Sequence, residues 1–229
     1  MSKKNTTHPT GIGENIEVAI SRTEMFIEKY QKQLIYGVVA IVVIVCGVIL
    51  FNRFYSSPRE LEAQDQITKG ERYFATDSFR LAINGDGVDY LGFKRIIENY
   101  GSTKAANMAY AYAGISAYKL GEYEQAIGYL KDFDGNGDIN VSPVLNGLIG
   151  DAYAELNNTD EALAYYKKAY QTDNIAFSPL FLKKAGLILE SKGETSKAVE
   201  LYTEIKDKYF QSAEAQDIDK YIERANLKK

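Results

Sequence analysis

The strongest constraint on this chain is an uninterrupted apolar segment near its N-terminus. Residues Leu34 to Phe51 read LIYGVVAIVVIVCGVILF, and these 18 residues include no charge and 13 Leu, Ile, Val or Phe side chains. An α-helix of that length rises about 27 Å, close to the hydrocarbon thickness of a bilayer. A buried core helix would need apolar neighbours on every side, and the flanking sequence supplies none. The segment therefore predicts a single membrane span.

A cleaved signal peptide is the competing interpretation of the same segment. It is disfavoured because 33 residues precede the apolar run and no A-x-A pattern follows it. A lipoprotein is also disfavoured, since Val45 precedes Cys46 where a small residue is expected. We therefore expect the segment to stay attached as an anchor.

The N-terminal side of the span is expected to be a cytoplasmic head at residues 1–33. It begins with a polar, disordered stretch to Gly13. An amphipathic helix follows, with apolar positions at three- and four-residue spacing: Ile16, Ile20, Thr23, Ile27, Tyr30 and Leu34. This stripe favours a helix lying on the membrane surface, and a plain extension of the span is the alternative. The positive-inside rule mildly favours a cytoplasmic N-terminus.

A 36-residue repeat follows the span. Five positions recur in register in three successive copies. They hold a glycine, a Gly or Asn, an alanine, the aliphatic residue after that alanine, and a large side chain, in this order: Gly114, Gly150, Gly186; Gly121, Asn157, Gly193; Ala126, Ala162, Ala198; Ile127, Leu163, Val199; Tyr129, Tyr165, Leu201. This period indicates stacked helical hairpins. The small residues let helices approach closely, and the Gly or Asn ends each first helix in a left-handed conformation.

The segment AGISAYKLGEYEQAIGYL, residues 113–130, resembles the tetratricopeptide repeat, a helix–turn–helix unit. This resemblance implies an all-α fold: one N-terminal transmembrane helix, then a solenoid of helical hairpins with a C-terminal capping helix. The predicted layout is a head at 1–33, a span at 34–52, a linker at 53–59 and a repeat domain at 60–229. The domain divides into a degenerate copy at 60–100, clear copies at 107–140, 143–174 and 179–210, and a cap at 213–227. Residues 77–89 are expected to form a loop.

No catalytic constellation is found, so we expect a protein that is not an enzyme and uses no cofactor. His8, the only histidine, lies in the head, and Cys46, the only cysteine, lies in the span. Residues 132–140 follow the start of a calcium-binding loop, but Pro143 stands where the closing Glu is needed, which favours a plain inter-repeat connection. A net charge of −4 argues against nucleic-acid binding.

A protein-binding groove is the function that stacked hairpins favour. The repeat register places six side chains along it: Met108, Ile115, Tyr118, Asp151, Leu180 and Leu187. For Leu180 and Leu187, packing against the capping helix is the alternative. Within the span, four residues share one helical face, and three of them are small: Gly37, Ala40, Ile44 and Gly47. This face is a candidate for docking against a partner's transmembrane helix.

The whole layout resembles the ancillary subunit of the bacterial Sec translocon. The head, one span that ends in an aromatic and basic cluster (Phe51, Arg53, Phe54, Tyr55) and the repeats carry the resemblance. It implies a single-pass inner-membrane protein with a periplasmic repeat domain. The implied partners are translocon subunits and a membrane-anchored prolyl-isomerase chaperone. The alternative is an anchored repeat receptor of opposite topology that binds cytoplasmic partners.

Overall fold

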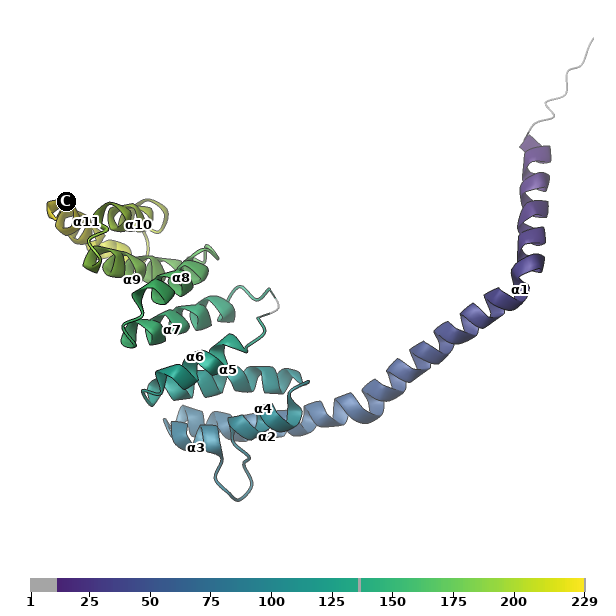
Figure 1. Cartoon of the computed structure of the whole chain (residues 1–229), viewed down its shortest axis with the longest axis horizontal. Coiled ribbons are helices and arrows are strands. Elements are labelled where there is room, and N and C mark those ends of the chain that lie inside the picture. Colours follow the sequence, from purple (N-terminus) through teal and green to yellow (C-terminus); the bar gives the residue numbers. More distant parts are fainter. Residues whose placement is uncertain (1–11, 136, 229) are drawn as a thin grey trace, which may run out of the picture. The chain divides into compact units, whose positions relative to one another are not determined.

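A computed structural model describes the backbone of residues 12–135 and 137–228, with side chains from residue 29 onwards (Figure 1). The described residues contain helices and no β-strand. Their order is α1 (Ile12–Phe51), the π-helix η1 (Asn52–Ser56), α2 (Ser57–Ala75), α3 (Phe79–Asn84), α4 (Phe93–Tyr100), α5 (Lys104–Lys119), α6 (Tyr123–Lys131), α7 (Val141–Glu155), α8 (Thr159–Tyr170), α9 (Ser178–Ser191), α10 (Thr195–Lys208), the 3₁₀ helix η2 (Glu214–Asp217) and α11 (Ile218–Leu227). Two compact units are present, Met1–Pro58 and Arg59–Lys229, and each is described by itself.

Helix α1 contains the apolar segment in a fully exposed state. Val38, Val43 and Ile49 are 61%, 64% and 60% exposed, and none of the apolar window is buried. By length and composition this helix fits a membrane anchor or a signal sequence. The predicted disordered stretch lies outside the described residues, apart from Ile12 and Gly13, which belong to α1. The side chains of the predicted stripe, up to Ile27, also lie outside them.

The residues predicted as a linker, 53–59, are helical. They form the π-helix η1 and the first turn of α2, and the N–H of Ser57 donates to the carbonyl of Asn52, five residues earlier. Pro58 lies just after this wide turn. A proline ring would clash with the carbonyl four residues before it in a regular α-helix, and a π turn displaces that carbonyl. The π turn therefore lets the chain remain helical at Pro58, a residue type that normally ends or kinks a helix.

The turns inside the hairpins repeat one hydrogen-bond pattern. Gly121, Asn157 and Gly193 have φ angles of 77°, 59° and 78°, which confirms the predicted left-handed residues. In each turn this residue donates its N–H to the carbonyl three positions before, and the next residue donates to the carbonyl five positions before. Asp77, with φ 56°, makes the same pair of bonds together with Ser78 after α2. A hairpin turn of the same kind therefore precedes α3.

The repeated glycines lie where two helices cross. A β-carbon added at Gly150 would lie 2.6 Å from the Tyr166 ring, and one at Gly114 would lie 2.5 Å from Leu130. Gly186 faces Tyr202 in the same way. In each copy the large side chain follows its glycine by 16 positions. The predicted reason for the glycines, close approach of neighbouring helices, is confirmed at these crossings.

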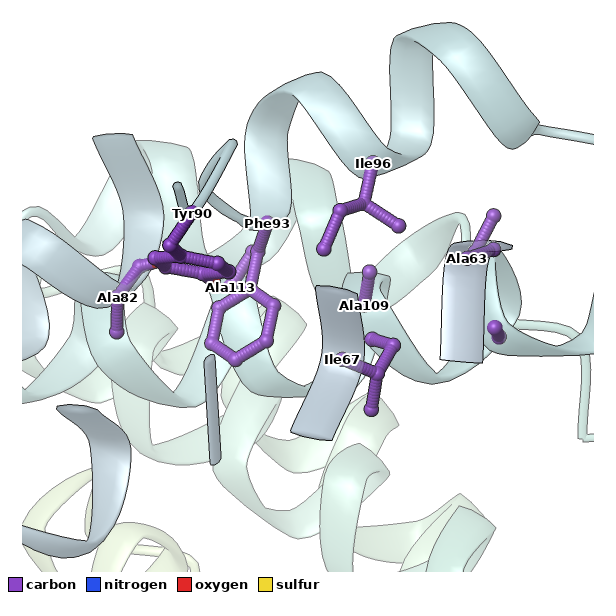
Figure 2. Close-up of a cluster of buried hydrophobic side chains, with 10 residues drawn as sticks. Ala63, Ile67, Ala82, Tyr90, Phe93, Ile96, Ala109 and Ala113 are labelled. Carbon is purple, nitrogen blue, oxygen red and sulfur yellow. The ribbon is translucent and has the colours of Figure 1, made fainter. Parts of the chain in front are cut away.

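The first copy contains the same parts with extra residues in its second helix. Gly70 faces Phe93, which follows it by 23 positions instead of 16. Ala82, buried in α3, follows Gly70 by 12 positions, as Ala126 follows Gly114. Seven extra residues therefore split the second helix into α3 and α4. Figure 2 shows side chains from α2, α3, α4 and α5 gathered into one cluster.

The prediction of a loop over residues 77–89 is wrong in its middle, because it contains α3. The real loop starts at Gly85, and α4 starts after Gly92. Both glycines have positive φ angles, 86° and 89°, and their backbones pack closely against each other. The Asp86 carboxylate accepts the N–H groups of three loop residues and, at 2.8 Å, the hydroxyl of Tyr73. These bonds hold the inserted loop against α2.

The C-terminal end of the repeat stack is closed by η2 and α11. Ile218 and Ala225 of α11 are buried in a cluster with Leu182, Tyr202 and other side chains of α9 and α10. The Glu190 side chain, 4% exposed, accepts two hydrogen bonds from Arg224 at 2.8 and 2.6 Å. This charge-assisted pair joins α9 to α11, at the position where the sequence predicts a capping helix.

Candidate protein-binding groove

The first helices of successive copies, α5, α7 and α9, present side chains in one register. Met108, Val144 and Leu180 are spaced by 36 residues, and so are Ile115, Asp151 and Leu187. We call the surface formed by these residues and Tyr118 the groove face. It contains all six side chains that the sequence predicts for a groove, and their role as a binding surface stays a prediction.

An apolar row runs along one side of the groove face. Met108 and Val144 are 38% and 36% exposed, and Leu180 is half-buried. At one end of the row, Met108 lines a cleft of about 650 Å³ at the start of α5. At the other end, Leu180 and Leu187 line a cleft of about 560 Å³ between α9 and the segment that leads into α11. The row thus connects two hollows.

The second row of the groove face consists of Ile115, Asp151 and Leu187. Most of its contacts are with other residues of the protein. Asp151 accepts a hydrogen bond from the Tyr166 hydroxyl at 2.7 Å and pairs with Lys184 at 2.7 Å. Burial raises the pKa of Tyr166, and the nearby Asp151 carboxylate raises it further, so the hydroxyl stays a donor. Asp151 therefore links α7 to α9 and is not a free charge for a ligand.

Equivalent contacts join the other first helices. Tyr112 of α5 donates to the Glu71 carboxylate of α2 at 2.9 Å. Burial first, then this bond, raise the pKa of Tyr112 to about 12. Ile115 and Leu148 both pack against the cluster between α5 and α7. Tyr118 packs against the same cluster. Its ring lies edge-on to the Tyr123 ring, with 5.5 Å between the two ring centroids.

At the last copy, the tail of the chain lies beside the groove face. Lys183 pairs with Asp217 of η2 at 2.7 Å, and its ammonium lies 4.3 Å from the Tyr221 ring centroid. Leu187 is still 40% exposed, and Leu180 packs partly against the Phe181 cluster. These two leucines line a cleft whose other wall is the tail, and both interpretations of them stay predictions.

Sequence reasoning missed one residue of the groove face and two residues beside it. Val144 is the member of the apolar row between Met108 and Leu180, and a step of 36 residues from either would have found it. Leu148 packs against the cluster between α5 and α7, and Lys184 pairs with Asp151, so each contacts a residue of a neighbouring copy. No local sequence signal identifies such pairs.

The candidate calcium loop is a connection held by hydrogen bonds. The Asp138 carboxylate accepts the N–H groups of Asn140, Val141 and Ser142, at the start of α7. These bonds lower the pKa of Asp138. Asn107 exchanges two hydrogen bonds of 2.8 Å with the backbone of Asp134. No group of three His, Cys, Asp or Glu side chains suited to a metal occurs within residues 29–135 and 137–228.

The small-residue face of the apolar segment is open. A β-carbon added at Gly37 or Gly47 would meet nothing within 4 Å, and Ile44 is 65% exposed. Ala40 is exposed as well. The described part of the chain therefore does not cover this face, and its use as a docking surface stays a prediction.

Comparison with known proteins supports the repeat architecture. Residues 143–210, which hold α7 to α10, match the family of YpiA-like C-terminal tetratricopeptide repeats. The crystal structure of the MamA protein is similar with a TM-score of 0.53 at 19% sequence identity, covering 72% of this chain and 91% of MamA. No curated protein matches the sequence. The chain is an all-α protein in which one long apolar N-terminal helix precedes helical repeats typical of the tetratricopeptide class.

Proposed function

We propose that this protein is a non-enzymatic scaffold whose groove face binds an apolar segment of a partner protein. The observation that carries this proposal is an apolar row that repeats on three successive first helices, with Met108 and Val144 exposed and Leu180 half-buried. The charged groups beside it, Asp151 and Lys184, are paired with each other. Apolar contacts are therefore what this surface offers, and a partially exposed Met adapts to varied side chains.

The scaffold is held at a membrane by the apolar segment of α1. Its exposed valines and isoleucines support this part of the proposal, because they find no partner in the described chain. The N-terminus lies in the cytoplasm and the repeat domain in the periplasm. The positive-inside rule and the resemblance in layout to the ancillary Sec subunit support this orientation.

The site of action is the Sec translocon of the bacterial inner membrane. Translocon subunits, a membrane-anchored prolyl-isomerase chaperone or emerging chains are the partners. The order of head, span and repeats supports this assignment, since it is the layout of that family. Emerging chains expose apolar segments before they fold, which fits the apolar row.

Site-specific photocrosslinking in native membranes tests the groove. A benzoylphenylalanine at Val144 is expected to give adducts with a defined partner. The same probe at Ser196, exposed at the start of α10, is the control. The added substitution Leu180→Glu should abolish the Val144 adducts, because it places a charge in the apolar row. Equal adducts from both positions, unaffected by Leu180→Glu, would contradict a groove-specific partner.

Protease added to spheroplasts tests the topology. The repeat domain should be digested while cytoplasmic proteins stay intact. Protection of the domain would instead favour the anchored receptor of opposite topology. Identification of the adducts by mass spectrometry then decides the Sec assignment, which requires translocon subunits, the isomerase or exported chains among them.

A further inference from the structure

One edge of the repeat domain is formed by the starts of the first helices and the ends of the second helices. Contacts between neighbouring copies run along it. The Glu60 carboxylate, in the first turn of α2, accepts the N–H groups of Lys104 and Ala105 at 2.8 and 3.1 Å, where α5 begins. Asn107 then bonds to Asp134, in the connection between α6 and α7. The edge is therefore continuous over the first copies.

The same chain of contacts continues to the end of the stack. Asn174, between α8 and α9, donates its side-chain amide to the carbonyl of Ile139 at 3.4 Å. Asp173 pairs with Lys208 at 2.7 Å and accepts the Tyr209 hydroxyl at 2.6 Å, where α10 ends. Each inter-repeat connection is thus joined to the next, from α2 to the residues after α10.

Large apolar side chains project from this edge in every copy. Leu61, which follows Glu60 near the start of α2, is 66% exposed. Ile139, Ile175 and Phe210, in the three connections, are 65%, 77% and 68% exposed. We call the surface formed by these four residues the entry edge, because the chain enters the repeat domain there at Arg59.

The opposite edge differs in composition. It consists of the turns inside the hairpins, at residues 76–78, 120–122, 156–158 and 192–194, all of which are described. No large apolar side chain in these four turns is exposed. The two edges have the same backbone role, to connect helices, so connection alone does not explain the apolar residues of the entry edge.

The short distance in sequence between the apolar segment and the start of the repeat domain indicates which surface the entry edge faces. Arg59 follows Phe51, the end of the apolar segment, by eight residues, a rise of about 12 Å in a helix. Resting on the proposed membrane anchor, we propose that the entry edge lies against the lipid surface and that Ile139, Ile175 and Phe210 insert into its interfacial region. Charges of both signs lie at this edge, as in the neighbouring pairs Lys131–Asp132 and Asp207–Lys208. Apolar burial rather than net charge therefore provides the attraction.

Fluorescence quenching by lipids tests this contact in the full chain. Cys46→Ser gives a background without cysteine, since Cys46 is the only one. Single cysteines at Ile139, Ile175 and Phe210 are labelled with the environment-sensitive dye NBD. Matched controls at Glu124 and Ser196 lie in the first turns of α6 and α10, at the opposite edge, and are exposed. The proteins are reconstituted into vesicles of phosphatidylcholine and phosphatidylglycerol, with or without doxyl-labelled lipid.

The expected result is a blue-shifted emission and at least twofold quenching by doxyl lipid at the three entry-edge positions, with little change at the two controls. Raising the salt concentration should leave the quenching in place. Equal, weak quenching at all five positions would overturn the proposal while flotation with the vesicles still supports the anchor. A blue shift that grows with protein density without lipid quenching would assign the edge to a second copy and also overturn it. Failure to float would defeat the anchor and this inference together.

Discussion

Glycines and aliphatic side chains occur in both α1 and the repeat domain, and their surroundings are opposite. Gly37 and Gly47 of α1 have open space around them, whereas Gly150 is pressed against the Tyr166 ring. Val43 is 64% exposed, whereas Leu182 is fully buried. The same residue types therefore have packing partners in the repeat domain and none within the described chain in α1. Composition alone does not separate these two cases, but the spacing of the residues does.

The spacing teaches what each glycine is for. In the repeat domain a glycine recurs every 36 residues and is followed at fixed distance by an Ala and a large side chain, so it belongs to a helix crossing within the protein. In α1 the small residues share one face of a uniformly apolar helix. Such a face has no partner within the described residues, and its docking against a neighbouring transmembrane helix stays a prediction.

The largest expected effect is on the repeat glycines. Gly150→Leu should lower the free energy of unfolding of the repeat domain by about 1–3 kcal/mol, because the new side chain must displace the Tyr166 ring. Glu155→Leu, an exposed position on the same helix, should change it by less than about 0.5 kcal/mol. Thermal unfolding of both variants measures the difference. Equal midpoints would show that the crossing does not depend on the glycine.

A smaller effect is expected at the C-terminal cap. Glu190→Gln should cost about 1–2 kcal/mol, because it removes charge-assisted hydrogen bonds from Arg224, whose own side chain is 40% exposed. The hydrogen bonds from Arg224 and Lys228 lower the pKa of Glu190 from its ordinary value of 4.5 to about 2.

The pH dependence of this effect follows from the lowered pKa. A carboxyl group whose pKa falls on folding stabilises the folded state above the unfolded pKa, and this stabilisation is lost as the pH drops through the folded pKa. The gap in stability between the natural protein and Glu190→Gln should therefore be full above pH 4.5 and shrink steadily towards pH 2. Denaturant titrations over this range measure it. A gap independent of pH would mean that Glu190 contributes by packing alone.

The smallest expected effect on stability is in α1. Replacing Gly37 and Gly47 with Leu should leave the unfolding of the repeat domain and the membrane insertion unchanged, because open space surrounds both glycines. The recovery of a partner from mild detergent should nevertheless fall. Val39→Leu together with Val43→Leu, on another face, is the matched control. Equal recovery with both double variants would reduce the segment to an anchor.

The regular copies were predictable from sequence, because one set of small residues recurs in a fixed register. The first copy was predicted only as a degenerate one at 60–100, without its helix boundaries, since its glycine, Gly70, precedes Gly114 by 44 residues instead of 36. The turn residues Asn84 to Gly87 drew attention to a loop and hid α3, although Ala82 and the left-handed Asp77 belong to the repeat pattern. An insertion inside a helix moves every later position out of register.

The candidate groove was predictable in part for the same reason. Register arithmetic predicts Met108, Leu180 and Leu187 on one surface, and in the structure Met108 and Leu187 are exposed while the half-buried Leu180 lines a cleft. It does not reveal that Asp151 is paired with Lys184, because that contact depends on how far neighbouring copies are rotated against each other. Side-chain pairs between copies need the three-dimensional packing.

The proposed anchor requires that the apolar segment stays with the protein in the membrane, and this can be measured directly. Bacterial membranes containing the full chain are washed with alkaline carbonate, and the intact mass of the pelleted protein is measured. We expect the protein in the pellet with the mass of all 229 residues, because the exposed apolar helix of α1 is covered by lipid. Release of the protein into the supernatant, or a shortened chain that begins after the apolar segment, would contradict a permanent anchor and identify the segment as a cleaved signal sequence or a peripheral helix.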